Sequence, residues 1–99
     1  MAHITFRAFE AGARARGFDE VLEREWAPGA VAAAHTHPFD ADALVVQGEM
    51  WLTVDDVVRH LLSGDTFALD ANVMHAERSG SEGATYWVAR RNVSDLAAD

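Results

Sequence analysis

The sequence predicts an all-β domain, built as a barrel or a sandwich, on two observations. Short runs in which apolar residues alternate with polar ones recur along most of the chain, as half-buried strands require. Turn signals such as Pro28-Gly29, Asp55-Asp56 and Ser63-Gly64-Asp65 separate these runs. Many short strands interrupted at this spacing are typical of sandwiches and barrels rather than of helical bundles.

The expected strands are, in chain order, residues 18–26, 31–37, 43–46, 50–54, 57–62, 66–69 and 84–89. Between them we expect a turn at Gly48-Glu49, a tight turn at residues 70–72 and a flexible hairpin loop at residues 79–83. In the strand at residues 57–62, His60 is expected to be a surface or pairing residue, because no second histidine lies at a ligand spacing from it.

The two ends of the chain are less regular than its centre. Residues 3–10 alternate as an edge strand would, whereas the Ala, Glu and Arg content of residues 7–16 favours a short helix. Residues 90–99 form a polar tail, with a single helical turn at residues 94–98. We therefore expect one domain over residues 1–99, with a core at about 18–89, an extension at 1–17 and a tail at 90–99.

Composition excludes several classes of function. The chain has no Cys, which removes disulfides, thiolate metal sites and Cys nucleophiles. Its net charge of −8 argues against nucleic-acid binding, because contacts to phosphates need basic patches. No apolar run is long enough for a signal peptide or a membrane span, so the expected location is cytoplasmic, without membrane association.

Histidines supply the chemistry that stands out. His35 and His37 are two residues apart in an expected strand, so both imidazoles point to one face of the sheet. His75 lies far along the sequence, directly after the tight turn at residues 70–72. If its segment pairs beside the first, three imidazoles converge, and imidazole is a good ligand for zinc, iron and nickel.

The spacing of these residues resembles the two signatures of the cupin superfamily. The first match is Gly29, five residues, His35-x-His37, ten residues and Gly48. The second is Gly64, ten residues and His75. Together they span roughly residues 20–89. The resemblance implies a double-stranded β-helix, the cupin jelly-roll barrel, with a divalent metal ion (Zn, Fe, Ni or Mn) at its mouth.

The chain departs from the family pattern at the carboxylate ligand. The position that the family fills with Glu is Ala41, which cannot bind a metal. Asp42 keeps a permitted spacing from His37, and we take it as the fourth ligand after His35, His37 and His75; Asp40 is the weaker alternative. A bulge is needed to turn Asp42 inward. The other interpretation is that both aspartates lie on a solvated acidic loop.

Glu77 lies two residues after His75 and shares its face if the strand is regular. It is a candidate general base or an orienting partner for an imidazole, and otherwise a surface carboxylate paired with Arg78 or Arg90. Two functions remain open at this stage. One is a metal-binding cupin, in some cases an enzyme, acting on a small oxygenated or acidic metabolite. The other is a non-catalytic cupin that binds or senses a sugar-like small molecule.

The expected partners are a small-molecule ligand and a second copy of the chain. A barrel of 99 residues buries a limited fraction of its surface and is marginal alone. The apolar residues of its N-terminal strands, among them Phe18 and Trp26, exceed what a small monomer usually exposes. Related cupins often pair across a two-fold axis, which implies a homodimer mainly through these strands, with Trp26 or its neighbours near the interface.

Overall fold

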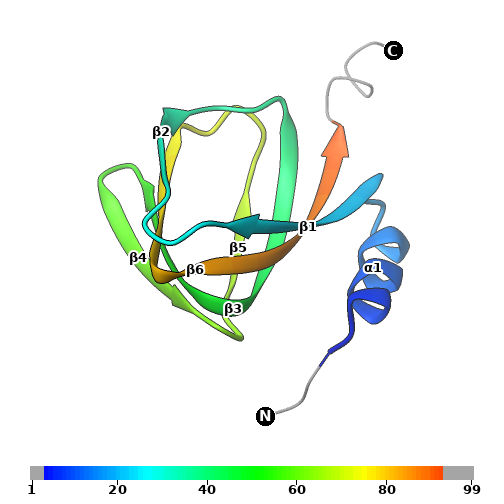
Figure 1. The fold of residues 1–99 in the computed structure, drawn as a ribbon. Coiled ribbons are helices and arrows are strands. Elements are labelled where there is room, and N and C mark those ends of the chain that lie inside the picture. The colour runs from blue at the N-terminus through cyan, green and yellow to red at the C-terminus, as the bar shows by residue number, and fades with distance from the viewer. Residues whose placement is uncertain (1–3, 93–99) are drawn as a thin grey trace.

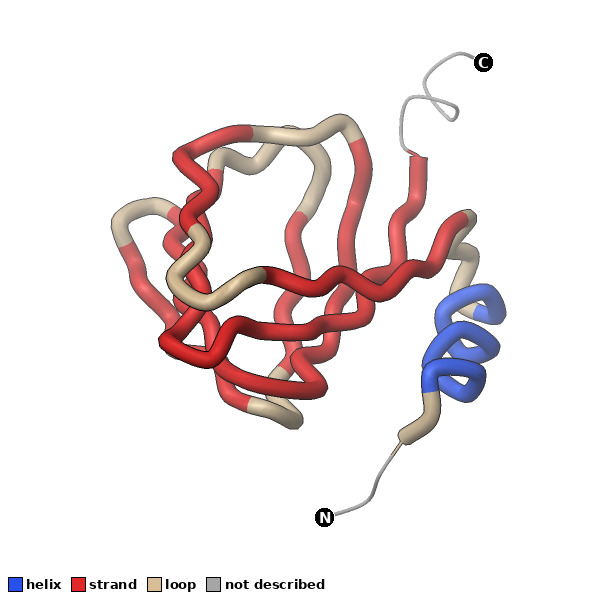
Figure 2. Tube along the Cα trace, in the orientation of Figure 1, coloured by secondary structure: helices blue, strands red, loops and turns tan. Residues whose placement is uncertain are grey.

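The computed structural model describes residues 4–92, which fold as one helix and six strands (Figures 1 and 2). In chain order these are α1 (Phe6–Ala15), β1 (Glu20–Trp26), β2 (Val31–His35), β3 (Phe39–Val54), β4 (Val57–Leu62), β5 (Thr66–Leu69) and β6 (His75–Asn92). The predicted all-β class is confirmed. No helix in the described part of the chain is long and apolar enough to cross a membrane.

Strands β3 and β6 pair antiparallel along almost their whole length and form the spine of the sheet. Residues 39–48 of β3 and 84–92 of β6 are flanked by β5 and β1, whereas residues 50–54 and 75–79 are flanked by β4 and β2. The continuous sheet therefore bends into a roll with two walls (Figure 1). We call the wall with β1 and β5 the helix-side wall, and the wall with β2 and β4 the opposite wall.

The bend between the walls lies at glycine. Gly48 has a φ of 76°, and the β3–β6 register shifts between Val45 and Gln47 and again between Gly48 and Met50. A Cβ atom at Gly48 would collide with the carbonyl oxygen of Gly83, so the two strands approach most closely here.

Two sequence predictions were wrong at this point of the fold. The turn expected at Gly48-Glu49 is a bend inside β3, and the flexible loop expected at residues 79–83 is a bend inside β6. Glycine within a strand often marks a bulge or a close approach of backbones rather than the end of the strand. The seven predicted strands are therefore six, two of which are long and bent.

The core fills the space between the walls. Its most buried members include Ala43 and Val45 before the bend of β3 and Met50 and Leu52 after it. In each segment the buried residues alternate, as expected of a strand with one face on the core.

The helix α1 lies outside the roll, beside β1 and β6 (Figure 1). The Thr5 side chain caps its start by accepting from the Ala8 N–H, and Phe6 and Phe9 pack on Trp87 with ring centroids 5.5 and 5.9 Å away. Of the two interpretations of the N-terminal segment, the helix is correct. At the other end β6 continues to Asn92, beyond the predicted residue 89, and the helical turn expected at 94–98 lies outside the described residues.

Candidate metal centre

One histidine from each of the two signature segments lies on the opposite wall, and the two are side by side. His35 of β2 is directly across from His75 of β6, and their ring centroids are 4.4 Å apart. Each ring uses Nδ1 to donate to a backbone carbonyl, His35 to Ala33 (2.7 Å) and His75 to Val73 (2.9 Å). A carbonyl can only accept, so these contacts place the proton on Nδ1 and leave the Nε2 lone pair available to a ligand.

Glu77 completes the cluster from the next inward position of β6. Its side chain is buried, and its Oε1 lies 3.3 Å from Nε2 of His75. One donor atom from each of His35, His75 and Glu77 lies within 4.8 Å of the others. This contradicts the interpretation of Glu77 as a surface carboxylate: Arg78 points to the other face, over the ring of Trp51.

The cluster contains buried polar atoms whose hydrogen-bonding capacity is not used. Among the described residues, neither Nε2 of His75 nor Oε2 of Glu77 has a hydrogen-bond partner, although both atoms are buried. Burial raises the pKa of the Glu77 carboxyl, and the nearby His75, His35 and Arg24 lower it by a smaller amount. Burying a polar atom without a hydrogen-bond partner costs free energy. A metal ion bound between these atoms would remove that cost for all of them.

His37 lies beside this group but not within it. Its ring stacks on Phe39 at 4.0 Å, and its centroid is 4.7 Å from that of His75. Its carbonyl accepts the N–H of Asn72, whose φ of 67° confirms the tight turn expected at residues 70–72. Burial and the neighbouring His75 lower the pKa of His37, which favours the neutral imidazole that a metal needs.

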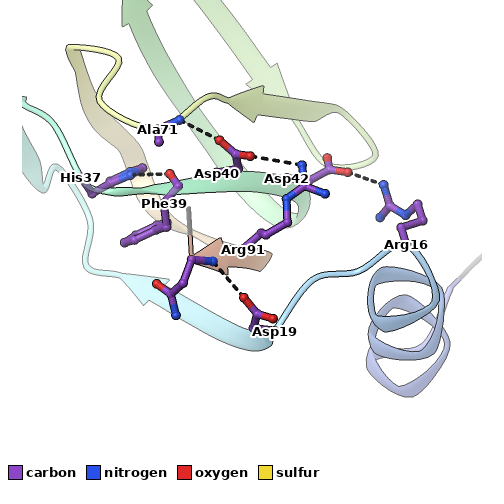
Figure 3. A network of polar contacts seen from close by, with 9 residues as sticks. Arg16, Asp19, His37, Phe39, Asp40, Asp42, Ala71 and Arg91 are labelled. Atoms are coloured by element: carbon purple, nitrogen blue, oxygen red, sulfur yellow. Dashed lines mark hydrogen bonds and ion pairs between the residues drawn. The ribbon is translucent and has the colours of Figure 1, made fainter. Parts of the chain in front are cut away.

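The structure does not bring Asp42 to the histidines. Along β3 the buried residues are Ala41, Ala43 and Val45, so Asp42 faces outward and binds Arg16 at 2.6 Å (Figure 3). Asp40 shares that outer face, where it accepts from the Ala71 N–H and from Arg91. The bulge that would turn Asp42 inward is absent here, because the first register shift follows Val45.

A cavity of about 180 Å³ lies between the two walls. The opposite wall contributes His35 and Glu77, and the helix-side wall contributes aromatic, aliphatic and arginine side chains. Its other lining residues are Arg24, Trp26, Ala32, His37, Phe39, Ala41, Phe67, Leu69, Tyr86, Val88 and Arg90. Ala41 thus faces the cavity from the position where the family pattern has Glu, but it brings no ligand atom.

Sequence reasoning missed the two arginines of this cavity. Arg24 alternates with Leu22 and Trp26, so an arginine on the apolar face of an expected strand was the available signal.

Trp26 itself lines the cavity and packs against Tyr86, with ring centroids 6.4 Å apart. Its side chain therefore faces inward, and the expected homodimer stays a prediction. His60 pairs with Glu49 at 2.7 Å and stacks on Trp51, as a surface pairing residue should.

The fold and the site together define a small β-roll protein with a cluster of histidine and carboxylate donors, two of which, His35 and Glu77, line its cavity. Comparison with known families identifies the class: the cupin domain family matches residues 22–89. The chain therefore belongs to the cupin family, and the predicted double-stranded β-helix is confirmed. None of the curated proteins matches the chain.

Several solved structures share the fold. An RmlC-like cupin from Shewanella frigidimarina is 25% identical, with a TM-score of 0.64 over 77% of this chain and 68% of that one. KdgF from Halomonas sp. is 23% identical, with a TM-score of 0.63 over 77% and 71% of the two chains. An oxalate decarboxylase variant from Bacillus subtilis is 19% identical, with a TM-score of 0.67, and the match covers 73% of this chain but 20% of that chain.

Proposed function

We propose that this protein is a metal-binding cupin whose ion is held by His35, His75 and Glu77, with His37 as the adjacent fourth candidate. The observation that carries the proposal is the convergence of donor atoms from His35, His75 and Glu77 within 4.8 Å of one another. Two atoms of this group, Nε2 of His75 and Oε2 of Glu77, are buried and have no hydrogen-bond partner among the described residues. This set keeps three of the residues expected from the sequence and replaces Asp42 by Glu77.

The donor set bears on the kind of metal. Two imidazoles and one carboxylate suit iron, zinc, manganese or nickel, and a set of three protein ligands leaves positions open for a small molecule. When bound, such an ion supplies Lewis-acid or redox chemistry. The hydrogen bonds from Nδ1 of His35 and His75 to backbone carbonyls would fix the ring orientations, as is usual for metal-binding histidines.

The remaining residues of the cavity suit a small organic ligand. Apolar walls from Phe67, Leu69 and Val88 exclude water, while Tyr86 offers a hydroxyl from the helix-side wall. Burial raises the pKa of Tyr86 to about 12, so its hydroxyl stays protonated at neutral pH and can donate to a ligand. A small oxygenated or acidic metabolite fits this combination of an apolar wall and a few polar groups.

We propose a cytoplasmic homodimer as the working form. The interface moves from the N-terminal strands to the outer surface of the opposite wall, because Val31, Val58 and Leu62 are exposed there by 75%, 58% and 49%. Light scattering should report twice the chain mass, and the charge introduced by Val58→Glu should halve it. A wild-type monomer at micromolar concentration would contradict the dimer.

Elemental analysis of protein purified without a histidine tag tests the metal centre. We expect one ion per chain in the wild type and in His60→Gln, because His60 lies on the outer surface and pairs with Glu49. His35→Gln should lose the ion and keep the fold. Equal metal content in His35→Gln and His60→Gln would overturn the assignment. Metal-dependent turnover of a small molecule would then make the protein an enzyme, and binding without turnover a sensor.

A further inference from the structure

We infer that the cavity recognises a small carboxylate, and that Arg24 on β1 is the residue that binds it. The inference rests on the proposed function in taking this cavity as the ligand site, and it adds the chemical class of the ligand. Its evidence comes from the helix-side wall, whereas the metal proposal rests on the opposite wall.

The charge of the cavity is opposite to that of the protein. The chain carries a net charge of −8, yet two arginines and a single carboxylate, Glu77, line the cavity. A metal ion bound at Glu77 would make this excess of positive charge larger. Attraction of an anion into the cavity is therefore local and does not follow from the overall charge, which repels anions.

Arg24 is the arginine that is available for a ligand. Within residues 4–92 its guanidinium makes no ion pair and no side-chain hydrogen bond, whereas Arg14, Arg16, Arg90 and Arg91 all pair with carboxylates. Arg24 is directly across from Tyr86 in the β1–β6 register, on the same face of β1 as Trp26. Arg24 and Glu77 both line the cavity, Arg24 from β1 of the helix-side wall and Glu77 from β6 in the opposite wall.

Arg90 adds a second, fixed positive charge. Its guanidinium lies over the ring of Phe39 at 4.5 Å, and Phe39 in turn stacks on His37. One nitrogen pairs with Glu20 at 3.3 Å, while its buried Nε has no partner among the described residues. Arg90 therefore raises the potential at the His37 end of the cavity, and the free fork of Arg24 provides the bidentate contact that a carboxylate prefers.

The size of the cavity limits the ligand. At roughly 30 Å³ for each water-sized group, a volume of 180 Å³ holds about six non-hydrogen atoms. A hydroxy acid such as lactate has this size, carries one carboxylate and adds a hydroxyl that can reach the donors of the opposite wall. Ligands much larger than this would have to extend through the open side of the cavity.

Calorimetric titration of metal-free protein with lactate, lactamide and ethanolamine tests the inference. These probes carry a negative charge, no charge and a positive charge; lactate and lactamide are matched in size, and ethanolamine is smaller. We expect saturable binding of lactate at one site, at least about tenfold weaker binding of lactamide, and no binding of ethanolamine. Equal binding of lactate and lactamide, preference for ethanolamine, or no binding of lactate would each overturn the proposal.

Variants assign the contact to Arg24. Arg24→Gln should weaken lactate binding about tenfold or more, and Arg24→Lys should restore part of it, because a lysine keeps the charge without the fork. Arg7→Gln removes the same charge from the exposed surface of α1 and should leave binding unchanged. Wild-type affinity in Arg24→Gln, or an equal loss in Arg7→Gln, would overturn the role of Arg24.

The outcomes separate this inference from the metal proposal. Lactate binding is measured without metal, and metal content is measured without lactate. Loss of the ion in His35→Gln with unchanged lactate binding would support both. Intact metal stoichiometry with no preference for lactate would overturn the carboxylate site alone.

Discussion

The two walls of the roll face the same cavity, yet they offer a ligand opposite kinds of chemistry. The opposite wall presents lone pairs, from His35, His75 and Glu77, and the helix-side wall presents the guanidinium groups of Arg24 and Arg90. The spine strand β6 belongs to both walls and contributes to both sets. A single strand can do this because it bends, so that its first half and its second half face each other across the cavity.

The bends also change which residues point inward. Before the bend of β6 the buried positions include His75, Glu77 and Ser79, and after it they include Ala84, Tyr86 and Val88. Odd-numbered residues of this set point inward in one half and even-numbered residues in the other. An irregularity in a strand shifts the alternation by one residue, which moves every following side chain to the other face. The difference between the walls therefore depends on the bends.

The largest expected effect comes from filling the bend. Gly48→Ala should lower the free energy of unfolding by about 2–4 kcal/mol, because the new Cβ meets the Gly83 carbonyl and the backbone has a φ of 76°. Gly12→Ala is the matched control, since nothing lies within 4 Å of a Cβ there and the residue is helical. The control should stabilise by about 0.5–1 kcal/mol.

Urea denaturation of both variants measures the difference. Equal stability of Gly48→Ala and wild type would mean that the strands do not approach as closely as described, and the bend would not set the inward positions. Destabilisation by Gly12→Ala would point to a contact of α1 that the described residues do not show.

The next effect distinguishes carboxylates on the two faces of the sheet. Glu77→Gln keeps the size of the side chain but removes the charged ligand. We therefore expect metal affinity to fall at least about 100-fold, which is more than is usual when a residue that only hydrogen-bonds a metal ligand is replaced. Asp42→Asn should change metal affinity by less than about twofold, because Asp42 pairs with Arg16 outside the roll. Competition with a chelator of known affinity measures both. A larger loss in Asp42→Asn than in Glu77→Gln would reverse the assignment of faces.

Moving the carboxylate to the helix-side wall should change the metal affinity by a smaller factor. Ala41 lines the cavity from β3, where the family pattern has its Glu. Adding Ala41→Glu to the Glu77→Gln variant should recover about tenfold in metal affinity, because the new carboxylate would approach the same histidines from the helix-side wall. Ala41→Ser serves as the control without a charge. No recovery beyond that of the control would mean that the cavity is too wide for β3 to reach the ion.

The local pattern of the sequence predicted most strands and the histidines that converge, because alternation and turn residues are local properties. It could not predict that Gly48 and Gly80 lie inside strands, since glycine marks bends and turns alike. The tight turn at Asn72 was predictable, because asparagine tolerates a positive φ.

The site was predictable in part for the same reason. His35 and His75 follow from spacing, but the choice between Asp42 and Glu77 depends on the alternation of paired strands, which local sequence does not define. Asp42 could face inward only if the inward positions of β3 changed from odd-numbered to even-numbered residues before residue 42. The register shift that makes this change follows Val45. Arg24 went unnoticed because nothing in the sequence shows that it lacks an acidic partner.

The smallest expected effect concerns the outer surface of the helix-side wall. The Ala71 N–H, and then Arg91, hold the pKa of Asp40 below its ordinary value of 3.8. A carboxylate with a lowered pKa stabilises the fold above the ordinary value, and this contribution is lost as the pH falls through the folded-state pKa. Asp40→Asn should therefore cost less than about 1 kcal/mol at neutral pH, as for other exposed pairs, and this cost should disappear as the pH falls through the lowered folded-state pKa.

Urea midpoints at neutral and acidic pH check this expectation, with Asp55→Asn as the control. Asp55 is exposed in the β3–β4 turn, where asparagine tolerates its φ of 50° equally well, and it makes no side-chain hydrogen bond within the described residues. The control should leave the midpoint and its pH dependence unchanged. A pH-independent loss in Asp40→Asn would show that Asp40 acts as a neutral hydrogen-bond acceptor for Ala71. Its charge would then contribute nothing, and the contrast with buried Glu77 would rest on burial alone.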